Sequence, residues 1–326
     1  KRHQTDEKSA VDTKLSKYEV YDDLFPNRKD GVNAWVTIMR GCDKFCTFCI
    51  VPFTRGRERS RSVSGITKEV SKAVDQGFSE ITLLGQNVNS YDFEGIKFPE
   101  LLSSVAEVPG VRRIRYTSPH PQDINEELLE VMQKYKNICN YIHLPLQAGS
   151  NRILKRMNRT YTKEHFIELA LKIRDYLPGV GISTDIIVGF PGETDDDFED
   201  TINVMNKVNF DSAYTFKYSP RKGTKATEYD DQVKESIKQD RLSRVIDLQK
   251  SHTLLRNEVY VGNIENILIE KQSKKNKSMW TGRTDSNKWV VFDKSGYSVN
   301  DIVPVLITES RGITLHGKIS KKVKAA

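Results

Sequence analysis

The chain has 326 residues, of which 37% are hydrophobic and 29% charged, a globular composition with room for two domains. It holds no apolar run of the ~20 residues that span a membrane and no signal-peptide pattern at its start, so we expect a cytoplasmic protein without membrane contact. The net charge is +7, but residues 271–326 alone carry +8 (12 Lys and Arg against 4 Asp and Glu), which favours a polyanion as partner.

The first 30 residues differ from the rest of the chain. They hold seven basic and seven acidic side chains and few apolar ones, which is typical of a linker rather than a core. Because the chain begins with Lys1 and not with Met, we expect residues 1–30 to be a linker from a missing N-terminal domain.

Residues 31–257 alternate between short apolar runs and longer amphipathic ones. Strands are predicted at 34–39, 80–84, 112–117, 141–144, 181–188 and 212–218, and helices at 66–76, 99–108, 125–136, 163–176 and 194–208. This alternation predicts an α/β fold of parallel βαβ units. Six strands fit a partial (βα)6 barrel or an open doubly wound sheet, and the pattern alone does not choose. A long helix is predicted within 232–257.

Residues 258–326 have another pattern. Short strands are predicted at 259–261, 266–270, 289–292, 302–307 and 312–319, separated by Gly, Asn, Asp and Ser. Five short strands predict a small all-β, OB-like barrel. Trp280 and Trp289 belong either to its core or to a surface on which bases stack.

Three of the four cysteines, Cys42, Cys46 and Cys49, directly follow the first predicted strand. This loop lies at the carboxyl end of the strand, where α/β barrels build their active sites. Zinc usually takes four Cys or His ligands, and no second pair is nearby. Three thiolates suit an iron–sulfur cube with one open iron, which Phe48 would help to shield from water. A structural zinc site remains the alternative.

The spacing Cys-x-x-x-Cys-x-aromatic-Cys after a first strand resembles that of the radical S-adenosylmethionine (SAM) enzymes. In that family the cysteines hold a 4Fe–4S cluster whose open iron binds SAM, and an electron from the cluster cleaves the sulfonium. The resemblance implies a partial (βα)6 radical SAM barrel. It also implies metal-binding and catalytic roles for Cys42, Cys46 and Cys49, and an electron donor such as flavodoxin or ferredoxin.

Polar residues follow the later strands, where the resemblance implies contacts with SAM. The turn after the second strand would hold the methionyl amino group, and the ends of the third and fourth strands place further polar groups at the same mouth. Asp185 lies within an apolar strand, which is costly unless the carboxylate faces the mouth or a partner. The expected cofactor-binding residues are therefore Phe48, Gly85, Gln86, Asn87, Ser118, Gln147 and Asp185.

Four arginines, Arg55, Arg57, Arg59 and Arg61, lie just beyond the cysteines. Arginine favours phosphates and stacked bases, so we expect these side chains either to contact nucleic acid or to pair with internal carboxylates.

Other polar residues have simpler interpretations. We expect His120 and His143 to be hydrogen-bonded structural residues and Cys139 to be a buried structural thiol. Residues 195–197 are three aspartates, and we expect them to complement the N-terminal end of a helix that Thr194 caps, rather than to bind a metal.

Longer segments make the resemblance more specific. VPFTRGRERSR (51–61), LLGQNVNSY (83–91), HLPLQAGSNRILKRMNR (143–159), DIIVGFPGET (185–194) and FKYSPRKGTKA (216–226) resemble the methylthiotransferase branch, and closely the MiaB-type tRNA enzymes. Residues 258–326 resemble a TRAM domain, which binds tRNA. The resemblance implies methylthiolation of C2 of N6-isopentenyladenosine at position 37, next to the anticodon, with the anticodon stem-loop as partner and the target base unstacked.

The chain departs from this family in one respect. Methylthiotransferases carry a second, auxiliary 4Fe–4S cluster in an N-terminal domain with three more cysteines, and here only Cys139 remains. We therefore expect SAM cleavage and tRNA binding without complete sulfur insertion. The alternatives are a threonylcarbamoyladenosine or ribosomal-protein methylthiotransferase, and a non-catalytic, zinc-containing tRNA-binding module.

Overall fold

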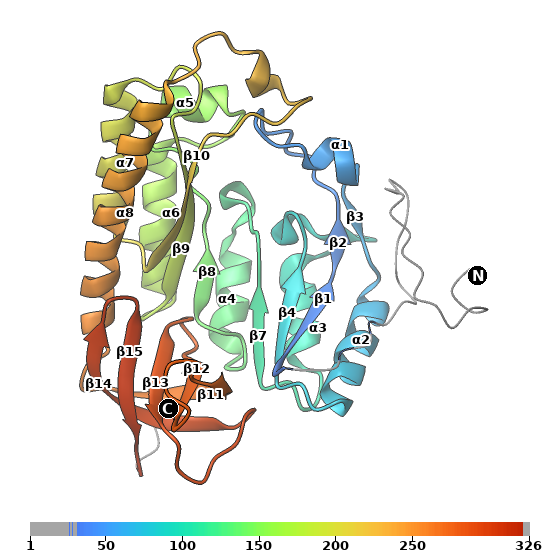
Figure 1. The fold of residues 1–326 in the computed structure, drawn as a ribbon. Coiled ribbons are helices and arrows are strands. Elements are labelled where there is room, and N and C mark those ends of the chain that lie inside the picture. Colours follow the sequence, from blue (N-terminus) through green and yellow to red (C-terminus); the bar gives the residue numbers. More distant parts are fainter. Residues whose placement is uncertain (1–25, 27, 29–30, 322–326) are drawn as a thin grey trace, which may run out of the picture.

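The computed structural model describes residues 26, 28 and 31–321, so nearly all of the expected linker lies outside the described residues. The parallel strands β1 (Asn33–Thr37), β4 (Glu80–Leu84) and β7 (Arg113–Tyr116) form one sheet, and β8 (Tyr141–His143), β9 (Gly181–Val188) and β10 (Ser212–Lys217) form a second. A parallel bridge between Ile114 and Ile138 joins the two sheets. The result is the expected partial six-stranded barrel, with β1 and β10 as its edges (Figure 1).

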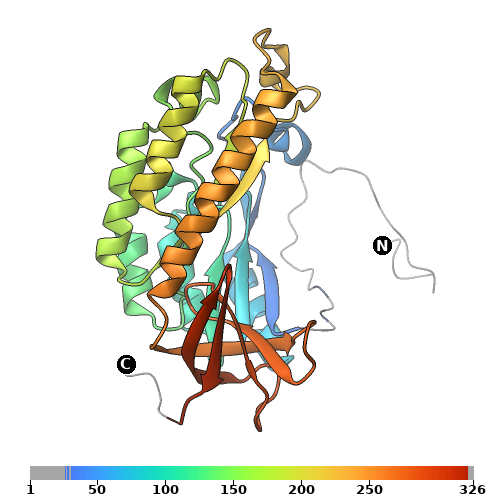
Figure 2. The ribbon, with the colours of Figure 1, turned by 60° about the vertical axis from the view of Figure 1, so that its left-hand side comes forward.

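Helices cover the outer face of this barrel (Figures 1 and 2). They are α2 (Val63–Asp75), α3 (Phe98–Ala106), α4 (Glu126–Lys134), α6 (Lys163–Tyr176) and α7 (Asp195–Val208). The strand side chains beneath them are apolar and fully buried, as at Ile81, Ile114 and Ile182. Thr194 caps α7 and forms a capping box with Asp197, which confirms the structural interpretation of the three aspartates.

The inner face of the barrel is polar. Side chains alternate along a strand, so residues between the apolar ones point inward. Paired residues in the strand register place Thr82 beside Arg115, His143 beside Ser183 and Asp185 beside Tyr214 on this face. A polar lining is unlike the layers of branched aliphatic side chains that fill a closed barrel, and it suits a polar ligand.

Short elements complete the domain, and the sequence pattern did not predict them. They are β2 (Met39–Arg40), α1 (Val51–Arg55), β3 (Arg59–Ser60), β5 (Asp92–Phe93), β6 (Ile96–Lys97) and α5 (Asn151–Arg156), with helical turns at Val88–Ser90, Pro121–Asp123 and Lys225–Glu228. Elements of two to six residues are too short to show a period.

The long helix α8 (Glu235–Glu258) runs along β10 to the small C-terminal barrel (Figure 2). That barrel closes in the order β11-β12-β13-β15-β14, with β11 (Ile264–Gln272), β12 (Met279–Arg283), β13 (Trp289–Asp293), β14 (Ile302–Arg311) and β15 (Thr314–Ile319). A fully buried apolar core that includes Phe292 and Leu315 fills it. No helix within residues 26, 28 and 31–321 is long and apolar enough to cross a membrane.

One strand prediction in this barrel was wrong, and one strand was missed. Residues 259–261 form a turn that continues from α8, with the N–H groups of Tyr260 and Val261 bonded to the carbonyls of Asn257 and Glu258. β12 was missed because its sequence, MWTGR, contains a glycine. A Cβ on Gly282 would lie 2.1 Å from the carbonyl oxygen of Leu268, so this strand needs glycine for close approach to β11.

The small barrel packs against the amino ends of the inner strands, opposite the end that carries α1 (Figure 1). Glu80, at the start of β4, is fully buried and lies 2.9 Å from both Arg115 and Arg283. Arg115 also donates hydrogen bonds to the carbonyls of Thr284 and Asp285. Burial alone would raise the pKa of Glu80, but Arg115 and Arg283 hold it below its usual value. The charged side chains at the amino ends of the strands therefore pair with residues of the small barrel.

We predict that Glu80→Gln destabilises the protein by roughly 3–5 kcal/mol at pH 7, because it leaves a buried arginine without its carboxylate. Denaturant unfolding measures this, with Asp92→Asn in an exposed pair as control. Since the pKa of Glu80 is lowered on folding, its contribution is present above the unfolded value of about 4.3 and is lost as the pH falls through the folded value. The parent–variant difference should therefore shrink below about pH 4. An unchanged free energy of unfolding at pH 7 would contradict the network.

Candidate functional site

The cysteine loop, residues 41–50, lies between β2 and α1 at the carboxyl ends of the inner strands. Two contacts clamp its start: the N–H of Gly41 donates to Oε1 of Gln86 at 2.7 Å, and the N–H of Cys42 donates to the carbonyl of Gly56 at 3.2 Å. Gly41 has φ +85°, and a Cβ there would lie 2.0 Å from the Arg57 carbonyl oxygen. Only glycine lets the two segments meet here.

The three thiols open into one cavity of about 450 Å³, which we call the cluster cavity. Every residue that the sequence assigned to the cluster or to SAM lines it. These residues come from five separate segments that the barrel brings together: Cys42, Cys46, Phe48, Cys49, Gly85, Gln86, Asn87, Ser118, Gln147 and Asp185.

The thiols of the loop are half-buried and influence one another. Burial raises the pKa of Cys42 to about 11, with Glu58 and the other two thiols adding to the rise, and burial also raises the pKa of Cys49. Thiolates at such a place need positive charge to compensate them. Arg159 supplies it on one side, because its Nη1 lies 3.4 Å from Sγ of Cys46.

Arg159 is held in this position on its other two sides. Its Nε donates to the Tyr161 hydroxyl at 2.9 Å, and its Nη2 donates to the carbonyl of Pro145 at 3.2 Å. The sequence pattern did not single out this residue, although it ends the quoted segment 143–159. No local pattern separates it from the arginines at 152 and 156, and only the fold brings it to Cys46.

The donor set fits an iron–sulfur cube better than a zinc ion. Zinc usually takes four Cys or His ligands around one ion, whereas a cube takes each thiolate on a different iron. The three thiols of the cysteine loop line one cavity, which is the donor set of a cube with one open iron.

The wall of the cluster cavity contains a buried amide oxygen, a hydrogen-bond acceptor that has no donor among the described residues. Asn87 is 1% exposed, and its Nδ2 donates to Asp123 at 3.0 Å. Its Oδ1 has no hydrogen-bond partner among the described residues. Lys44 lies 2.7 Å from Asp123 and so fixes the carboxylate that orients the amide. A buried carbonyl oxygen without a partner is costly, which fits a ligand that donates to it.

Two further cavity residues have strained backbones. Ser118 has φ +56° and Gln147 has φ +70°, in the left-handed region that residues other than glycine rarely adopt. Each follows an inner strand, β7 or β8. The N–H of Gln147 donates to the Asp185 carbonyl at 2.8 Å, which ties the turn to β9. Strain of this kind clusters at ligand sites.

The histidines differ from each other. His120 is buried, and burial together with Arg159 and Lys44 lowers its pKa to about 2, so the ring is neutral. Its Nδ1 accepts from the N–H of Gln122, which fits the expected structural role. His143 lines the cluster cavity as His120 does: its Nε2 lies 3.3 Å from Asp185 and its Nδ1 2.8 Å from the Ser183 hydroxyl. These contacts fit the expected structural role, and they also hold Asp185 at the mouth.

The four arginines after the cysteine loop differ in exposure and in their partners. Arg55 and Arg57 are exposed, and Arg57 pairs with Asp43 at 3.0 Å. Arg59 is half-buried, and its Nη2 donates to the Arg55 carbonyl. Arg61 is 5% exposed and pairs with buried Glu69 at 2.7 Å. For Arg61 the structure corrects the expectation of an RNA contact, because this side chain takes the internal carboxylate instead.

Outside the mouth, Cys139 and the tryptophans complete the set of singled-out residues. Cys139 is 3% exposed, away from the cluster cavity, as expected for a structural thiol. Trp280 packs against the core of the small barrel, and Lys294 lies 4.2 Å from its ring centre. Trp289 is half-buried, with Lys271 4.9 Å from its ring centre. Exposed lysines at 271, 274, 275, 277, 294 and 318 make this barrel basic.

Comparison with known proteins gives two family matches. A model described as the Radical SAM superfamily matches residues 36–205, and one described as the TRAM domain matches residues 258–320. The tRNA-2-methylthio-N(6)-dimethylallyladenosine synthase of Acetivibrio thermocellus is 46% identical over 321 residues, covering 95% of this chain and 67% of that protein. The protein of the same name from Carboxydothermus hydrogenoformans is 47% identical, covering 93% and 69%. The crystal structure of methylornithine synthase (PylB) aligns with a TM-score of 0.48 at 15% identity, over 69% of this chain and 68% of that one.

Proposed function

The chain belongs to the radical SAM superfamily and carries a C-terminal TRAM domain, and from this premise we propose that it is a tRNA methylthiotransferase. The proposed reaction places a methylthio group on C2 of an N6-isopentenyladenosine next to the anticodon. The single observation that carries this proposal is the cluster cavity, where all ten residues expected at the cluster and at SAM meet. The dimethylallyl group in the names of the relatives supports this substrate over threonylcarbamoyladenosine.

The residues of the cluster cavity have distinct proposed roles. Cys42, Cys46 and Cys49 would hold a 4Fe–4S cluster, and Arg159 keeps Cys46 oriented toward it. The cluster and SAM, when bound, supply a one-electron route to C–H bonds that acid–base chemistry does not break. Phe48 excludes water from this part of the cavity.

The SAM-facing side of the cavity orients the cofactor. The Oδ1 of Asn87 accepts from the SAM amino group, and Asp185, held by His143, accepts from a further donor group of the bound cofactor. Gln86 also lines the cavity, and its Oε1 accepts from the N–H of Gly41, so it positions the cysteine loop as well. Its amide nitrogen and its neighbours in the turn stay available for SAM.

The rest of the proposal concerns partners. We place the anticodon stem-loop on the exposed lysines of the small barrel, with Arg55 and Arg57 beside the mouth.

Sulfur insertion would need a second 4Fe–4S cluster that this chain cannot ligate, since its fourth cysteine, Cys139, is buried away from the mouth. An electron donor such as flavodoxin or ferredoxin would act at the cluster, and the reaction would take place in the cytoplasm.

The test of this function is SAM cleavage by the anaerobically reconstituted chain under reduction. We expect 5′-deoxyadenosine from the parent and from Cys139→Ala, and none from Cys46→Ala. With tRNA deuterated at C2 of its isopentenyladenosine, we expect deuterium in the 5′-deoxyadenosine. Equal output from Cys46→Ala would contradict the enzyme assignment. Cleavage without deuterium transfer would contradict the substrate alone.

A second prediction concerns Asn87. Replacing it with alanine removes the acceptor for the SAM ammonium, so SAM should bind about 10-fold more weakly or worse, as expected for a hydrogen bond to a charged group. Equilibrium dialysis on reconstituted protein measures this. Iron content must equal that of the parent, and Asn276→Ala in the exposed small-barrel turn serves as control. Unchanged SAM affinity would contradict the role of Asn87.

The lysines of the small barrel give a third prediction. Removing the whole barrel would expose the buried charges at Glu80, so we choose alanine at exposed Lys274, Lys275 and Lys277. Binding of the stem-loop should weaken, and the slope of log affinity against log salt should fall by about one unit for each phosphate group that is no longer bound. The matched control replaces exposed lysines 134, 136 and 207 on the helical side. An equal slope in both triple variants would refute the placement.

A further inference from the structure

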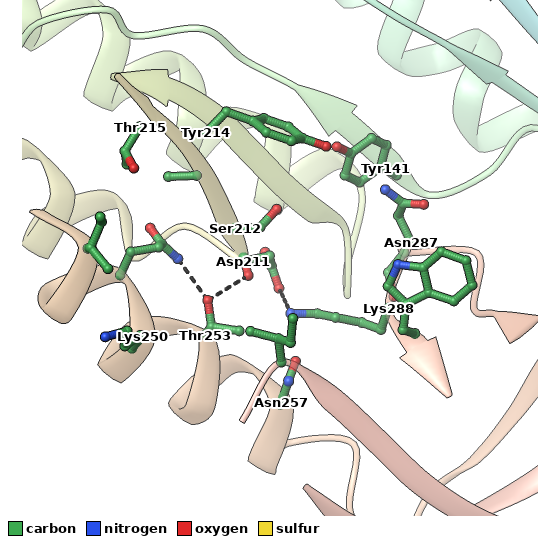
Figure 3. A pocket seen from close by; sticks show the side chains of 16 residues that line it. Tyr141, Asp211, Ser212, Tyr214, Thr215, Lys250, Thr253, Asn257, Asn287 and Lys288 are labelled. Atoms are coloured by element: carbon green, nitrogen blue, oxygen red, sulfur yellow. Dashed lines mark hydrogen bonds and ion pairs between the residues drawn. The ribbon is translucent and has the colours of Figure 1, made fainter. Parts of the chain in front are cut away.

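A second cavity, of about 430 Å³, lies where the six-stranded barrel, α8 and the small barrel meet (Figure 3). We call it the interdomain cavity. Tyr141 and Tyr214 enter it from β8 and β10, Asn257 from α8, and Asn287 and Lys288 from the turn before β13. In Figure 3 the two tyrosine rings point toward each other across the top of the cavity. None of these residues has a role in the proposed cluster or SAM site.

The wall of this cavity holds two hydrogen-bond acceptors that have no donor among the described residues. Gln249 is 6% exposed, and its Nε2 donates to the Phe210 carbonyl at 2.9 Å and to Thr253 at 3.0 Å. Asn257 is fully buried, and its Nδ2 donates to the Gly312 carbonyl at 3.0 Å. Within the part of the chain that the structure describes, neither side-chain oxygen has a partner. Both therefore require N–H or O–H donors from outside the chain.

The charges of the interdomain cavity are already balanced. Asp211 is 4% exposed, and its Oδ1 lies 2.8 Å from Nζ of Lys288 (Figure 3) and 3.2 Å from Nε of Arg256. A phosphate would meet this buried carboxylate, and Lys250, the other lysine of the lining, pairs with Asp247 at 2.8 Å. A neutral, planar group with amino hydrogens matches the two acceptors and the aromatic rings.

The rim of the cavity is apolar and open. Tyr214 is 56% exposed and Ile313 is 69% exposed, and both line the cavity. Exposed aromatic faces of this kind serve as stacking platforms for bases. Exposed Lys271 lies 4.9 Å from the ring centre of Trp289, which also lines the cavity, and its ammonium group offers positive charge to a nucleic-acid backbone.

Shared lining residues connect the interdomain cavity to the cluster cavity. A smaller cavity of about 250 Å³ shares Tyr141 and Tyr214 with the interdomain cavity and Ser118, His143 and Asp185 with the cluster cavity. An RNA that contacts both the small barrel and the cysteine loop would therefore pass close to the interdomain cavity.

We infer that the interdomain cavity binds a second unstacked base of the RNA substrate, one that carries an exocyclic amino group. The inference rests on the proposed function, since it requires an RNA whose target base enters the mouth. The amino group donates to one of the two acceptors on α8, Oε1 of Gln249 or Oδ1 of Asn257, and Tyr214 covers the ring. Adenine, cytosine and guanine supply this donor, whereas uracil presents a carbonyl oxygen in place of the amino group.

The experiment is a double-mutant cycle between protein and RNA. The probe is a fluorescent anticodon stem-loop with isopentenyladenosine, together with versions made abasic at each other loop position in turn. We expect one abasic position, at an amino-bearing base, to weaken binding to the parent by about 10-fold. The same position should cost less than 3-fold in Tyr214→Ala, because that variant has no ring for the base to stack on. Leu171→Ala, which trims a side chain 51% exposed on the outer helix α6, should leave the abasic cost unchanged.

A second variant separates this site from a folding effect and from the proposed function. Tyr214→Phe keeps the ring and should retain the abasic cost of the parent, and replacing the amino-bearing base of the RNA with uracil should weaken binding to the parent and to Tyr214→Phe alike. If abasic costs are equal in the parent and Tyr214→Ala at every position, while the triple lysine variant still weakens binding, the base site is wrong and the proposed function stands. If the stem-loop does not bind the parent, both are wrong.

Discussion

Buried polar side chains must find partners, and this requirement shapes both ends of the barrel. Its outer face is apolar beneath the helices, so the charged and polar side chains of the strands point inward. At the amino end, Glu80 pairs with Arg115 and with Arg283 of the small barrel, and Arg115 donates a hydrogen bond to the carbonyl of Thr284. At the carboxyl end, Asn87 keeps an acceptor that no described residue satisfies. The first end therefore takes a domain as partner, and the second is left for a ligand.

This arrangement separates the two kinds of recognition in space. The basic small barrel lies at the opposite end of the strands from the cysteine loop (Figure 1). An RNA that contacts both must extend along the open inner face between β1 and β10. Cavities that share Tyr141 and Tyr214 lie between these two ends. Under the proposed function, they would link the place where the RNA is held to the base that reaches the mouth.

The sequence predicted those parts of the site that follow from strand ends. Loops after parallel strands meet at one edge, so Cys42, Asn87 and Asp185 were expected together from their positions in the sequence. The places of Arg61 and Arg159 could not be predicted, for the opposite reason. Composition says that an arginine is present, but only packing decides that Arg61 turns inward to Glu69 and that Arg159 reaches Cys46. β12 was missed because its sequence has no hydrophobic period. Gly282 stands where a side chain would block the close approach of two backbones.

The central claim is that three thiols hold an iron–sulfur cube at the mouth of the barrel. The most direct measurement is an anaerobic crystal structure of the reconstituted chain with diffraction data collected on both sides of the iron and zinc absorption edges. The account predicts iron anomalous density bounded by the sulfurs of Cys42, Cys46 and Cys49, with no zinc signal. A single tetrahedral zinc, or a loop that takes up no metal, would contradict it.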